Sequence, residues 1–397
     1  MKTVSIIGVG MGPDTLTREG QRAIEQAGLL IGAPRLLSLF CPAGVPSFSA
    51  YAPEPVAQAV RESSADRVAV LVSGDVGFYS AAGTIARALS SLNADILTIS
   101  GISSLNYFFA RLGLSWADAA LVSCHGRSQN LIDTVRRNRV TFALTGGNAP
   151  ALAEGLAGAG FGGLQVRVGE NLGSDRERVF SCTASELSGR ELSSLTVLLV
   201  ENPGADASVP TGIPDERFIR GSVPMTKAEV RSVILSKLSL SPGDICWDVG
   251  AGTGSVTVEM ALSAYRGHVY AVDRNEDAME LIRENCRAFH LGNVTPVSGS
   301  APQALEDLPP ADAVFIGGSG GTMEQTVDAV LSRNPRARIV ISAIALETVG
   351  AALRALSDAG LSPEVVQLSV ARARQAGELH LLMAQNPIFL ISAGGRP

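Results

Sequence analysis

The sequence predicts two α/β domains in one chain, each built on a mostly parallel sheet with helices on its faces. Short apolar segments alternate with helical patterns along the whole chain, and glycine-rich loops directly follow several of these segments. Apolar periodicity stops at residues 202–214, N-P-G-A-D-A-S-V-P-T-G-I-P, where Pro and Gly concentrate. We therefore expect domains at residues 1–203 and 218–397, joined by a linker at 204–217.

The first domain is expected to contain seven strands. They are Thr3–Val9, Val68–Val72, Ile96–Ser100, Leu121–Ser123, Thr141–Leu144, Gln165–Gly169 and Thr196–Val200. The apolar segment after Lys2 runs into glycines without a cleavage pattern, which favours a buried strand over a signal peptide. Open α/β sheets bind ligands at the carboxyl ends of their strands. The candidate loops are therefore G-V-G-M-G-P (8–13), S-G-D-V-G (73–77), G-I-S-S (101–104), C-H-G-R (124–127) and T-G-G-N (145–148).

The second domain is expected to contain five strands that alternate with helices. They are Ile245–Val249, His268–Asp273, Asn293–Val297, Ala313–Ile316 and Arg338–Ala343. The chain then ends differently, because Val365–Ala371 and Leu379–Gln385 predict a closing hairpin that turns around residues 375–377. This ending is typical of a class I methyltransferase sheet rather than of a dehydrogenase.

Composition and charge indicate a protein that acts on small molecules. Acidic residues number 38 and basic residues 32, giving a net charge of −6 without a basic tail, so nucleic acid is not an expected partner. Every apolar run is far shorter than the roughly 18–20 residues that span a bilayer, and no membrane segment is expected. Five cysteines without a C-x-x-C pair predict neither disulfides nor a metal site, and they favour a reducing, cytoplasmic compartment.

A nucleotide-like cofactor is predicted by D-V-G-A-G-T-G-S-V, residues 248–256, which follows an expected strand. Its glycines allow a tight turn and close backbone approach to a ligand. Asp273 ends the next strand, where a carboxylate can accept both hydroxyls of a ribose. NAD would fit the glycines too, but Ser255 replaces the third glycine of G-x-G-x-x-G and Asp248 could meet a cationic methionine group. S-adenosylmethionine (SAM) is favoured, with a purely structural turn as the alternative.

Two further loops of the second domain are candidates for ligand contacts. Ser300 and Ala301 follow the third strand and are placed to pack on an adenine. The loop after the fourth strand is G-G-S-G-G, residues 317–321, where amine methyltransferases often carry Asn-Pro-Pro-aromatic to hold a planar amine. The absence of the Asn-Pro-Pro-aromatic motif argues against methylation of an exocyclic amine. The similar N-P-I-F at 386–389 is interpreted as structural.

The first glycine loop has a different expected role. Pro13 and Asp14 interrupt the route to the helix that begins near Thr17, so a phosphate cradle at that helix is not favoured. We expect the glycines around Gly10 and Met11 to make room for a bulky substrate or for close packing.

These motifs together resemble a known pair of families. The loops at 8–13, 73–75, 101–104 and 125–127 are similar to the tetrapyrrole (class III) methylases of the corrin pathway. P-M-T-K-A-E-V-R (224–231), the glycine motif, F-I-G-G-S-G-G (315–321) and A-L-E-T (345–348) resemble their class I partner. The resemblance covers nearly the whole chain. It implies a tetrapyrrole methylase fold of two α/β subdomains, fused to a Rossmann-like class I methyltransferase sheet.

The resemblance also implies an activity in cobalamin biosynthesis. Each domain would bind one SAM, the first methylating carbon 5 and the second carbon 15 of precorrin-6B. The second would also decarboxylate the ring C acetate, giving precorrin-8X. Cofactor contacts would come from Gly74, Asp75, Ile102, Ser103, Ser104, Thr226, Asp248, Gly250, Ala251, Gly252, Thr253, Gly254, Asp273, Ser300 and Ala301. Substrate contacts would come from Gly10, Met11, Arg127, Gly317, Gly318 and Ser319.

Two departures from the resemblance concern side-chain size, since Asp273 stands where Glu is common and Met11 fills a small position. Methyl transfer to an electron-rich carbon depends chiefly on alignment, whereas decarboxylation later needs a proton donor. His125 and Glu347 are the candidate catalytic residues, although Glu347 could simply cap a helix. Arginine suits substrate carboxylates, and Arg372 and Arg374 are further candidates beside Arg127.

Two other functions stay open at this point. Both folds have members that methylate RNA or protein, against which the acidic charge and the absent Asn-Pro-Pro motif weigh. One half could instead be a binding or scaffolding module that has lost its SAM site. A homo-oligomer is expected in either case, because oligomers are common for both folds.

Overall fold

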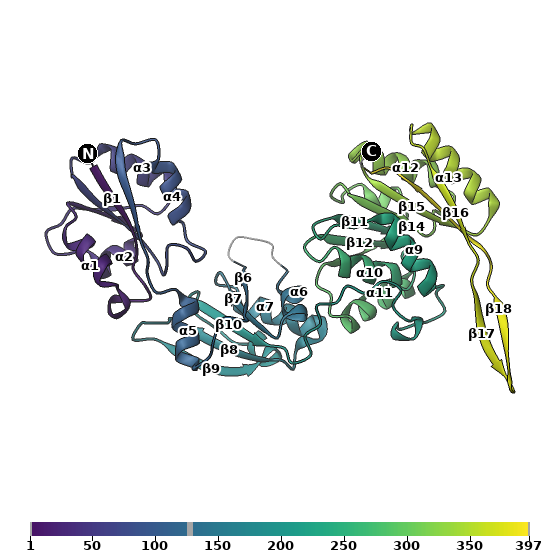
Figure 1. Cartoon of the computed structure of the whole chain (residues 1–397), viewed down its shortest axis with the longest axis horizontal. Coiled ribbons are helices and arrows are strands. Elements are labelled where there is room, and N and C mark those ends of the chain that lie inside the picture. Colours follow the sequence, from purple (N-terminus) through teal and green to yellow (C-terminus); the bar gives the residue numbers. More distant parts are fainter. Residues whose placement is uncertain (1, 125–129, 396–397) are drawn as a thin grey trace. The chain divides into compact units, whose positions relative to one another are not determined.

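The computed structural model describes residues 2–124 and 130–395 of the chain (Figure 1). The chain divides into two compact units. The first comprises Met1–Ser128, Arg139–Ala153 and Leu164–Asn202, and the second comprises Gln129–Asn138, Glu154–Gly163 and Pro203–Pro397.

The first sheet of the first unit is parallel throughout, with the order β3-β2-β4-β1-β5. Alternate side chains of its strands point to opposite faces. Helices α3 and α4 cover one face and α1 and α2 the other, each through a buried apolar cluster. The segment after Lys2 is the inner strand β1, as predicted. The elements are β1 Lys2–Gly8, α1 Arg18–Glu25, β2 Leu29–Gly32, α2 Pro34–Phe40, β3 Ser47–Ser49, α3 Pro53–Glu62, β4 Arg67–Val72, α4 Ala82–Leu89 and β5 Ala94–Ile99.

The second sheet has the order β6-β7-β10-β8-β9, and only β6 and β7 run parallel in it. The prediction of a mostly parallel sheet is therefore wrong for this part of the chain. Residues of α5 pack on its strands through a cluster of phenylalanines. The elements are α5 Ser104–Leu112, β6 Ala120–Ser123, α6 Leu131–Arg137, β7 Val140–Leu144, α7 Ala149–Leu156, a short π-helical turn Ala157–Phe161, β8 Gln165–Glu170, β9 Arg178–Thr183, α8 Ala184–Ser188 and β10 Thr196–Glu201.

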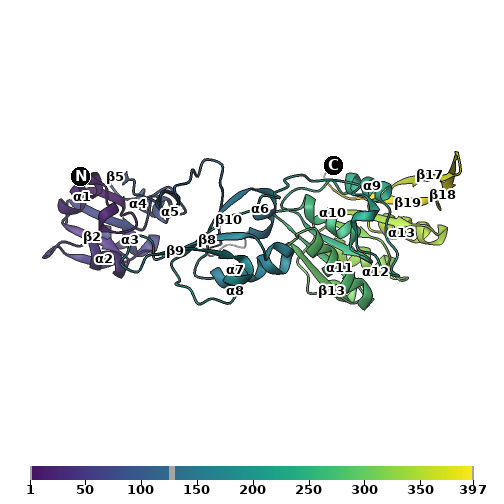
Figure 2. The ribbon, with the colours of Figure 1, turned by 90° about the horizontal axis from the view of Figure 1, so that it is seen from below.

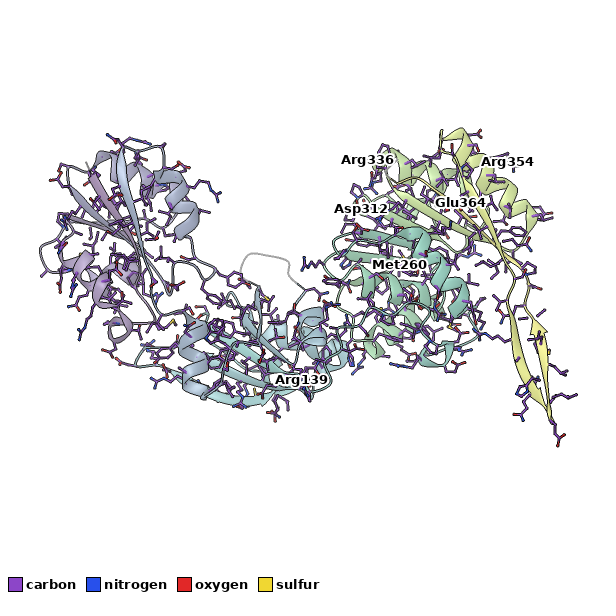
Figure 3. All side chains as sticks on the ribbon, in the orientation of Figure 1. Arg139, Met260, Asp312, Arg336, Arg354 and Glu364 are labelled. Carbon is purple, nitrogen blue, oxygen red and sulfur yellow. The ribbon has the colours of Figure 1, made fainter. Side chains whose placement is uncertain are left out.

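The third sheet lies in the second unit and has the order β13-β12-β11-β14-β15-β19-β16. Helices α9, α10 and α11 pack on one face, where Met260 lies in the core (Figure 3), and α12 and α13 pack on the other. The elements are α9 Ala228–Leu238, β11 Ile245–Val249, α10 Ser255–Ser263, β12 His268–Asp273, α11 Glu276–Ala288, β13 Val294–Ser298, β14 Ala313–Ile316, α12 Met323–Arg333, β15 Arg338–Ala343, α13 Leu346–Asp358, β16 Glu364–Leu368 and β19 Ile388–Ala393.

The end of the chain corrects the predicted closing hairpin. The sheet is closed by β19, which is antiparallel to both β15 and β16. Between β16 and β19 the chain forms a separate two-stranded hairpin of β17 (Ala371–Ala376) and β18 (Leu379–Ala384), here called the arm. The arm extends beyond the sheet in both views (Figures 1 and 2). Leu379, Leu381, Leu382 and Met383 of the arm are between 51% and 74% exposed. Among the described residues, no helix is long and apolar enough to cross a membrane.

Candidate active sites

Glycines bring three strand ends of the first sheet together at its carboxyl edge. A Cβ atom added to Gly8 would lie 2.7 Å from the carbonyl oxygen of Gly74 and 2.8 Å from the nitrogen of Gly101. A Cβ atom on Gly101 would collide with the carbonyl oxygens of Gly8 and Gly74. Gly10 and Gly74 exchange two backbone hydrogen bonds of 3.0 and 3.1 Å. Close packing of backbones therefore requires these glycines, and it places the predicted loops side by side.

The predicted cofactor residues of the first half lie on two of these loops. The Asp75 carboxylate accepts hydrogen bonds from the backbone nitrogens of Gly77 at 2.8 Å and Gly101 at 3.2 Å, so it joins the loop after β4 to the loop after β5. Ser103 is buried and caps α5, because its hydroxyl accepts from the Asn106 nitrogen at 3.1 Å. Gly74 and Ile102 share the same loops, with Ile102 38% exposed, and Ser104 begins α5 directly after them. Together they form one continuous rim.

Met11 contacts a segment that the sequence interpretation missed. A Cβ atom on Gly173, where φ is +75°, would lie 2.7 Å from the Met11 Cβ, and one on Gly12 would lie 2.6 Å from the Gly173 carbonyl oxygen. The loop at residues 171–177 therefore packs directly on the first glycine loop. The glycine of E-N-L-G, residues 170–173, was the available signal.

Glu177 fixes this loop to α5. Its carboxylate accepts from the Gly173 nitrogen at 2.6 Å and from the Tyr107 hydroxyl at 2.8 Å, and it pairs with Arg111 at 3.0 Å. Burial and the neighbouring Glu177 raise the pKa of the Tyr107 hydroxyl. One carboxylate thus joins the helix that Ser103 caps to the loop that packs on Met11. The predicted His125 and Arg127 lie outside the described residues.

The glycine-rich loop of the second half has the backbone that its sequence predicts. Gly250, Gly252 and Gly254 have φ values of +76°, +58° and +74°, a region that favours glycine. The space beside each is taken by protein atoms. Added Cβ atoms would lie 2.8 Å from the Gly318 nitrogen, 3.0 Å from the Pro224 carbonyl oxygen and 3.0 Å from a side-chain carbon of Ile282, respectively. The structure therefore brings Gly250, a predicted cofactor contact, together with Gly318, a predicted substrate contact.

Two carboxylates lie at this loop in different environments. Asp273 is half-buried, and its carboxylate accepts from the Gly252 nitrogen at 2.9 Å and the Asn275 nitrogen at 3.0 Å. Asp248 is fully buried beneath the loop, and burial raises its pKa to about 7. Its Oδ2 accepts from the Thr257 hydroxyl, whereas its Oδ1 and the hydroxyl of buried Thr253 have no hydrogen-bond partner within the described chain. A fully buried carboxyl with one unpaired oxygen is disfavoured in its charged form.

The remaining predicted residues of the second half lie along the same carboxyl edge. Ser300 is exposed and Ala301 is buried, and the Ala301 carbonyl accepts from the Thr322 hydroxyl at 2.9 Å. The neighbouring loop of Gly317, Gly318 and Ser319 follows β14, with its two glycines exposed. Glu347 is exposed in the first turn of α13, where its carboxylate faces solvent rather than an ion-pair partner among the described residues.

The chain segment at residues 212–227, directly before α9, covers the glycine-rich loop. Sequence reasoning missed the side-chain contacts that hold this segment. Fully buried Glu259 of α10 accepts from the nitrogens of Gly212 at 2.8 Å and Ile213 at 3.0 Å, and from Arg231 at 2.8 Å. Arg231, also fully buried, donates to the carbonyl oxygen of Thr226, a predicted cofactor residue. Residues 212–217, inside the predicted linker range, therefore pack within the second unit.

The side chain of Asn285 connects this covering segment to the glycine-rich loop. Its amide nitrogen donates to the carbonyls of Ile219 at 3.1 Å and Thr253 at 2.9 Å, and its oxygen accepts from the Ile219 nitrogen at 2.8 Å. Long-range contacts of this kind leave no local sequence signal. Within residues 2–124 and 130–395, no cluster of His, Cys, Asp and Glu could hold a metal ion.

Both halves match families of methyl-transferring proteins. The tetrapyrrole (corrin/porphyrin) methylases match residues 3–188, and the precorrin methyltransferase domain matches residues 218–393. The chain is therefore a methyltransferase enzyme with two such domains.

Individual relatives define the family more narrowly. A precorrin-6Y C(5,15)-methyltransferase [decarboxylating] from a Sinorhizobium species is 32% identical over 390 residues, which cover 94% of this chain and 92% of that protein. A "probable cobalt-precorrin-6B C(15)-methyltransferase (decarboxylating)" from Pyrobaculum calidifontis is 46% identical over 46% of this chain and 95% of that protein. A crystal structure of a precorrin-6Y C5,15-methyltransferase from Geobacter metallireducens is 40% identical, covers 47% of this chain and 96% of its own, and has a TM-score of 0.44. The chain belongs to the family of decarboxylating precorrin-6Y C(5,15)-methyltransferases.

Proposed function

We propose that this enzyme uses SAM to methylate precorrin-6B at meso carbons 5 and 15 and decarboxylates the ring C acetate, giving precorrin-8X. The observation that carries the proposal is the match to a decarboxylating C(5,15)-methyltransferase over 94% of the chain, which spans both halves. The first half would methylate carbon 5, and the second would methylate carbon 15 and decarboxylate. Each half has its own rim of close-packed glycine loops, so neither depends on the other for its backbone geometry.

The residues of the second half fit SAM, which supplies an activated methyl group on a sulfonium. The Asp273 carboxylate accepts two backbone hydrogen bonds, but each carboxylate oxygen has two lone pairs, so it can also accept from ribose hydroxyls. The buried oxygens of Asp248 and Thr253 that lack partners support a polar, cationic ligand above the loop. In the first half, the cofactor would be held by the rim around Asp75, Ile102 and Ser103.

The chain's own contribution to methyl transfer would be chiefly alignment. Holding two reactants in line can supply about 7–11 kcal/mol of a barrier. Gly317 and Gly318 are exposed, and a Cβ atom on Gly318 would have nothing within 4 Å, so the outer side of this loop leaves room for a broad, flat substrate. Decarboxylation additionally needs a proton at the carbon left behind, and a positioned acid typically contributes about 100- to 10,000-fold. Exposed Glu347 is our candidate for this proton donor. His125 is our candidate catalytic residue for the methylation by the first half.

The test is mass spectrometry of precorrin-6B incubated with SAM and the full-length enzyme. We expect a gain of two methyl groups and the loss of carbon dioxide. Gly252→Arg should place a large side chain at a φ of +58°, against the Pro224 carbonyl, and leave only the first methylation. Gly101→Leu should conversely disrupt the first rim and abolish methylation at carbon 5. An unchanged substrate mass with the unmodified enzyme would overturn the proposal.

Three accompanying expectations concern the surroundings of the reaction. Composition and resemblance predict that the enzyme has no nucleic acid or membrane partner. They also predict a cytoplasmic location and a homo-oligomeric state. Size-exclusion chromatography with light scattering would test the oligomeric state directly.

A further inference from the structure

The arm begins at the edge of the third sheet that carries the candidate site. Strand β16 is antiparallel to β19, which is antiparallel to β15, so β15 and β16 end at the same edge. β17 starts three residues after β16 ends. Side chains of the arm project with no other element beside most of its length (Figure 3). An isolated two-stranded hairpin is at best marginally stable in water. The position of the arm relative to the site therefore depends on contacts at its root.

One side chain at the root of the arm is tied to the rest of the second unit. The Arg372 guanidinium donates to both carboxylate oxygens of Glu229, with Nε–Oε1 at 3.0 Å and Nη2–Oε2 at 2.6 Å. Its Nη1 also donates to Oδ2 of Asp215 at 3.2 Å. Arg374 lies two residues further along the same strand and forms no ion pair within the described chain. Bidentate arginine–carboxylate pairs are both stronger and more directional than single contacts.

One acceptor lies in the segment that covers the glycine-rich loop, and the other lies directly after this segment. Asp215 is 2% exposed, and its Oδ1 accepts from the Ala228 nitrogen at 3.1 Å and from Arg231 at 3.0 Å. Glu229 lies in the first turn of α9. Asp215 and Glu229 thus hold the two ends of the stretch that passes over Gly252.

We propose that Arg372 is a positioning residue of the second methyl-transfer site, which ties the root of the arm to the segment over the glycine-rich loop and thereby holds this segment in its cofactor-binding form. The inference rests on the proposed function, since it requires SAM at that loop. Arg372 acts through Glu229 and Asp215 and does not itself contact the cofactor. Three of the five N–H groups of its guanidinium donate to these two carboxylates, so we assign Arg372 to the covering segment rather than to the substrate.

The test measures SAM binding by calorimetry in the full-length enzyme with Gly101→Leu, so that only the second site contributes. We expect Arg372→Gln to weaken this binding about fivefold to tenfold, the lower range of typical coupling between sites. Arg372→Lys should restore only part of the loss, because an ammonium cannot form the bidentate pair. Glu229→Gln should weaken binding similarly, and the double variant should be no weaker than either single one. Arg354→Gln, at an exposed arginine of α13 that forms no ion pair within the described chain, should leave the dissociation constant for SAM unchanged.

Several results would overturn the inference. Unchanged SAM binding by Arg372→Gln would do so, and so would additive effects of the Arg372 and Glu229 substitutions. Equal losses in the Arg372 and Arg354 variants would indicate a general charge effect rather than a specific contact. A rise in KM for the precorrin substrate at unchanged SAM binding would make Arg372 a substrate contact. If the enzyme without the Arg372 substitution bound no SAM, the proposed function would fail and this inference with it.

Discussion

Replacing Asp248 by asparagine should remove a pH dependence of stability that the structure assigns to one carboxyl group. Burial raises the pKa of Asp248 from its ordinary value of 3.8 to about 7 in the folded chain. Between these two values the folded state holds a proton that the unfolded state releases. The stabilisation by this group is therefore complete below about pH 4 and is lost as pH rises through 7.

The magnitude follows from the two pKa values. A pKa unit corresponds to about 1.4 kcal/mol, so the whole transition is worth about 4 kcal/mol. Between pH 5 and pH 8 the free energy of unfolding should fall by about 2.5 kcal/mol in the wild type through this group alone. The amide in Asp248→Asn cannot ionise. The free energy of unfolding of the variant should therefore rise, relative to that of the wild type, by the same amount between pH 5 and pH 8. An unpaired amide in place of Oδ1 adds a constant penalty, which the comparison across pH removes.

Urea unfolding at pH 5, 6, 7 and 8 would measure this difference. The chain has two tryptophans, and fully buried Trp247 adjoins Asp248, so a Trp116→Phe background reports on the second unit alone. Asp328→Asn is the matched control, because Asp328 is exposed in the same unit and its variant should differ from wild type equally at every pH. A difference between Asp248→Asn and wild type that stays constant within about 0.5 kcal/mol would refute the reasoning.

Three further predictions use single substitutions. Gly250→Ala adds a Cβ atom 2.8 Å from a neighbouring backbone nitrogen at a φ of +76°, and should abolish carbon 15 methylation and decarboxylation by mass spectrometry. Its control, Gly360→Ala, has a similar φ of +79° with nothing within 4 Å, so it should lower the free energy of unfolding by only about 1 kcal/mol and keep both activities. Glu177→Gln should loosen the loop at 171–177 and raise KM for the first methylation, whereas equal effects on both methylations would contradict a local role. Ser103→Ala removes the cap of α5 and should destabilise the first unit by about 1 kcal/mol, measured by urea unfolding through the fluorescence of Trp116 in the same unit.

Local patterns predicted most strands of the chain but not their direction. All seven strands expected in the first half are present, because buried strands appear as short apolar runs between turn residues. The same pattern is compatible with parallel and antiparallel pairing, so the antiparallel pairs of the second sheet could not be predicted from it. At the other end of the chain, the arm has apolar side chains that face solvent, and the apolar pattern alone assigned its residues to a hairpin that closes the sheet.

The candidate sites divide in the same way. The glycines of residues 250–254 were predictable because their motif requires a particular backbone, and their positive φ values agree with it. The depth of Asp248 was not predictable, since the atoms that bury it come from several elements. The contact of Gly173 with Met11 joins positions 162 residues apart, counted as 173 minus 11, and no local periodicity reports such a pair.

The sequence by itself determined the presence of two α/β halves, the loops that carry their candidate sites and the resemblance to corrin-pathway methylases. These properties depend on residue type and short spacing, which a single chain records directly. Tertiary structure alone decided which groups meet. It buried Asp248, engaged Asp75 and Asp273 with backbone nitrogens, and paired Arg372 with Glu229 across 143 residues. Contacts between distant segments depend on how whole elements pack, and packing is a property of the folded chain rather than of any one segment.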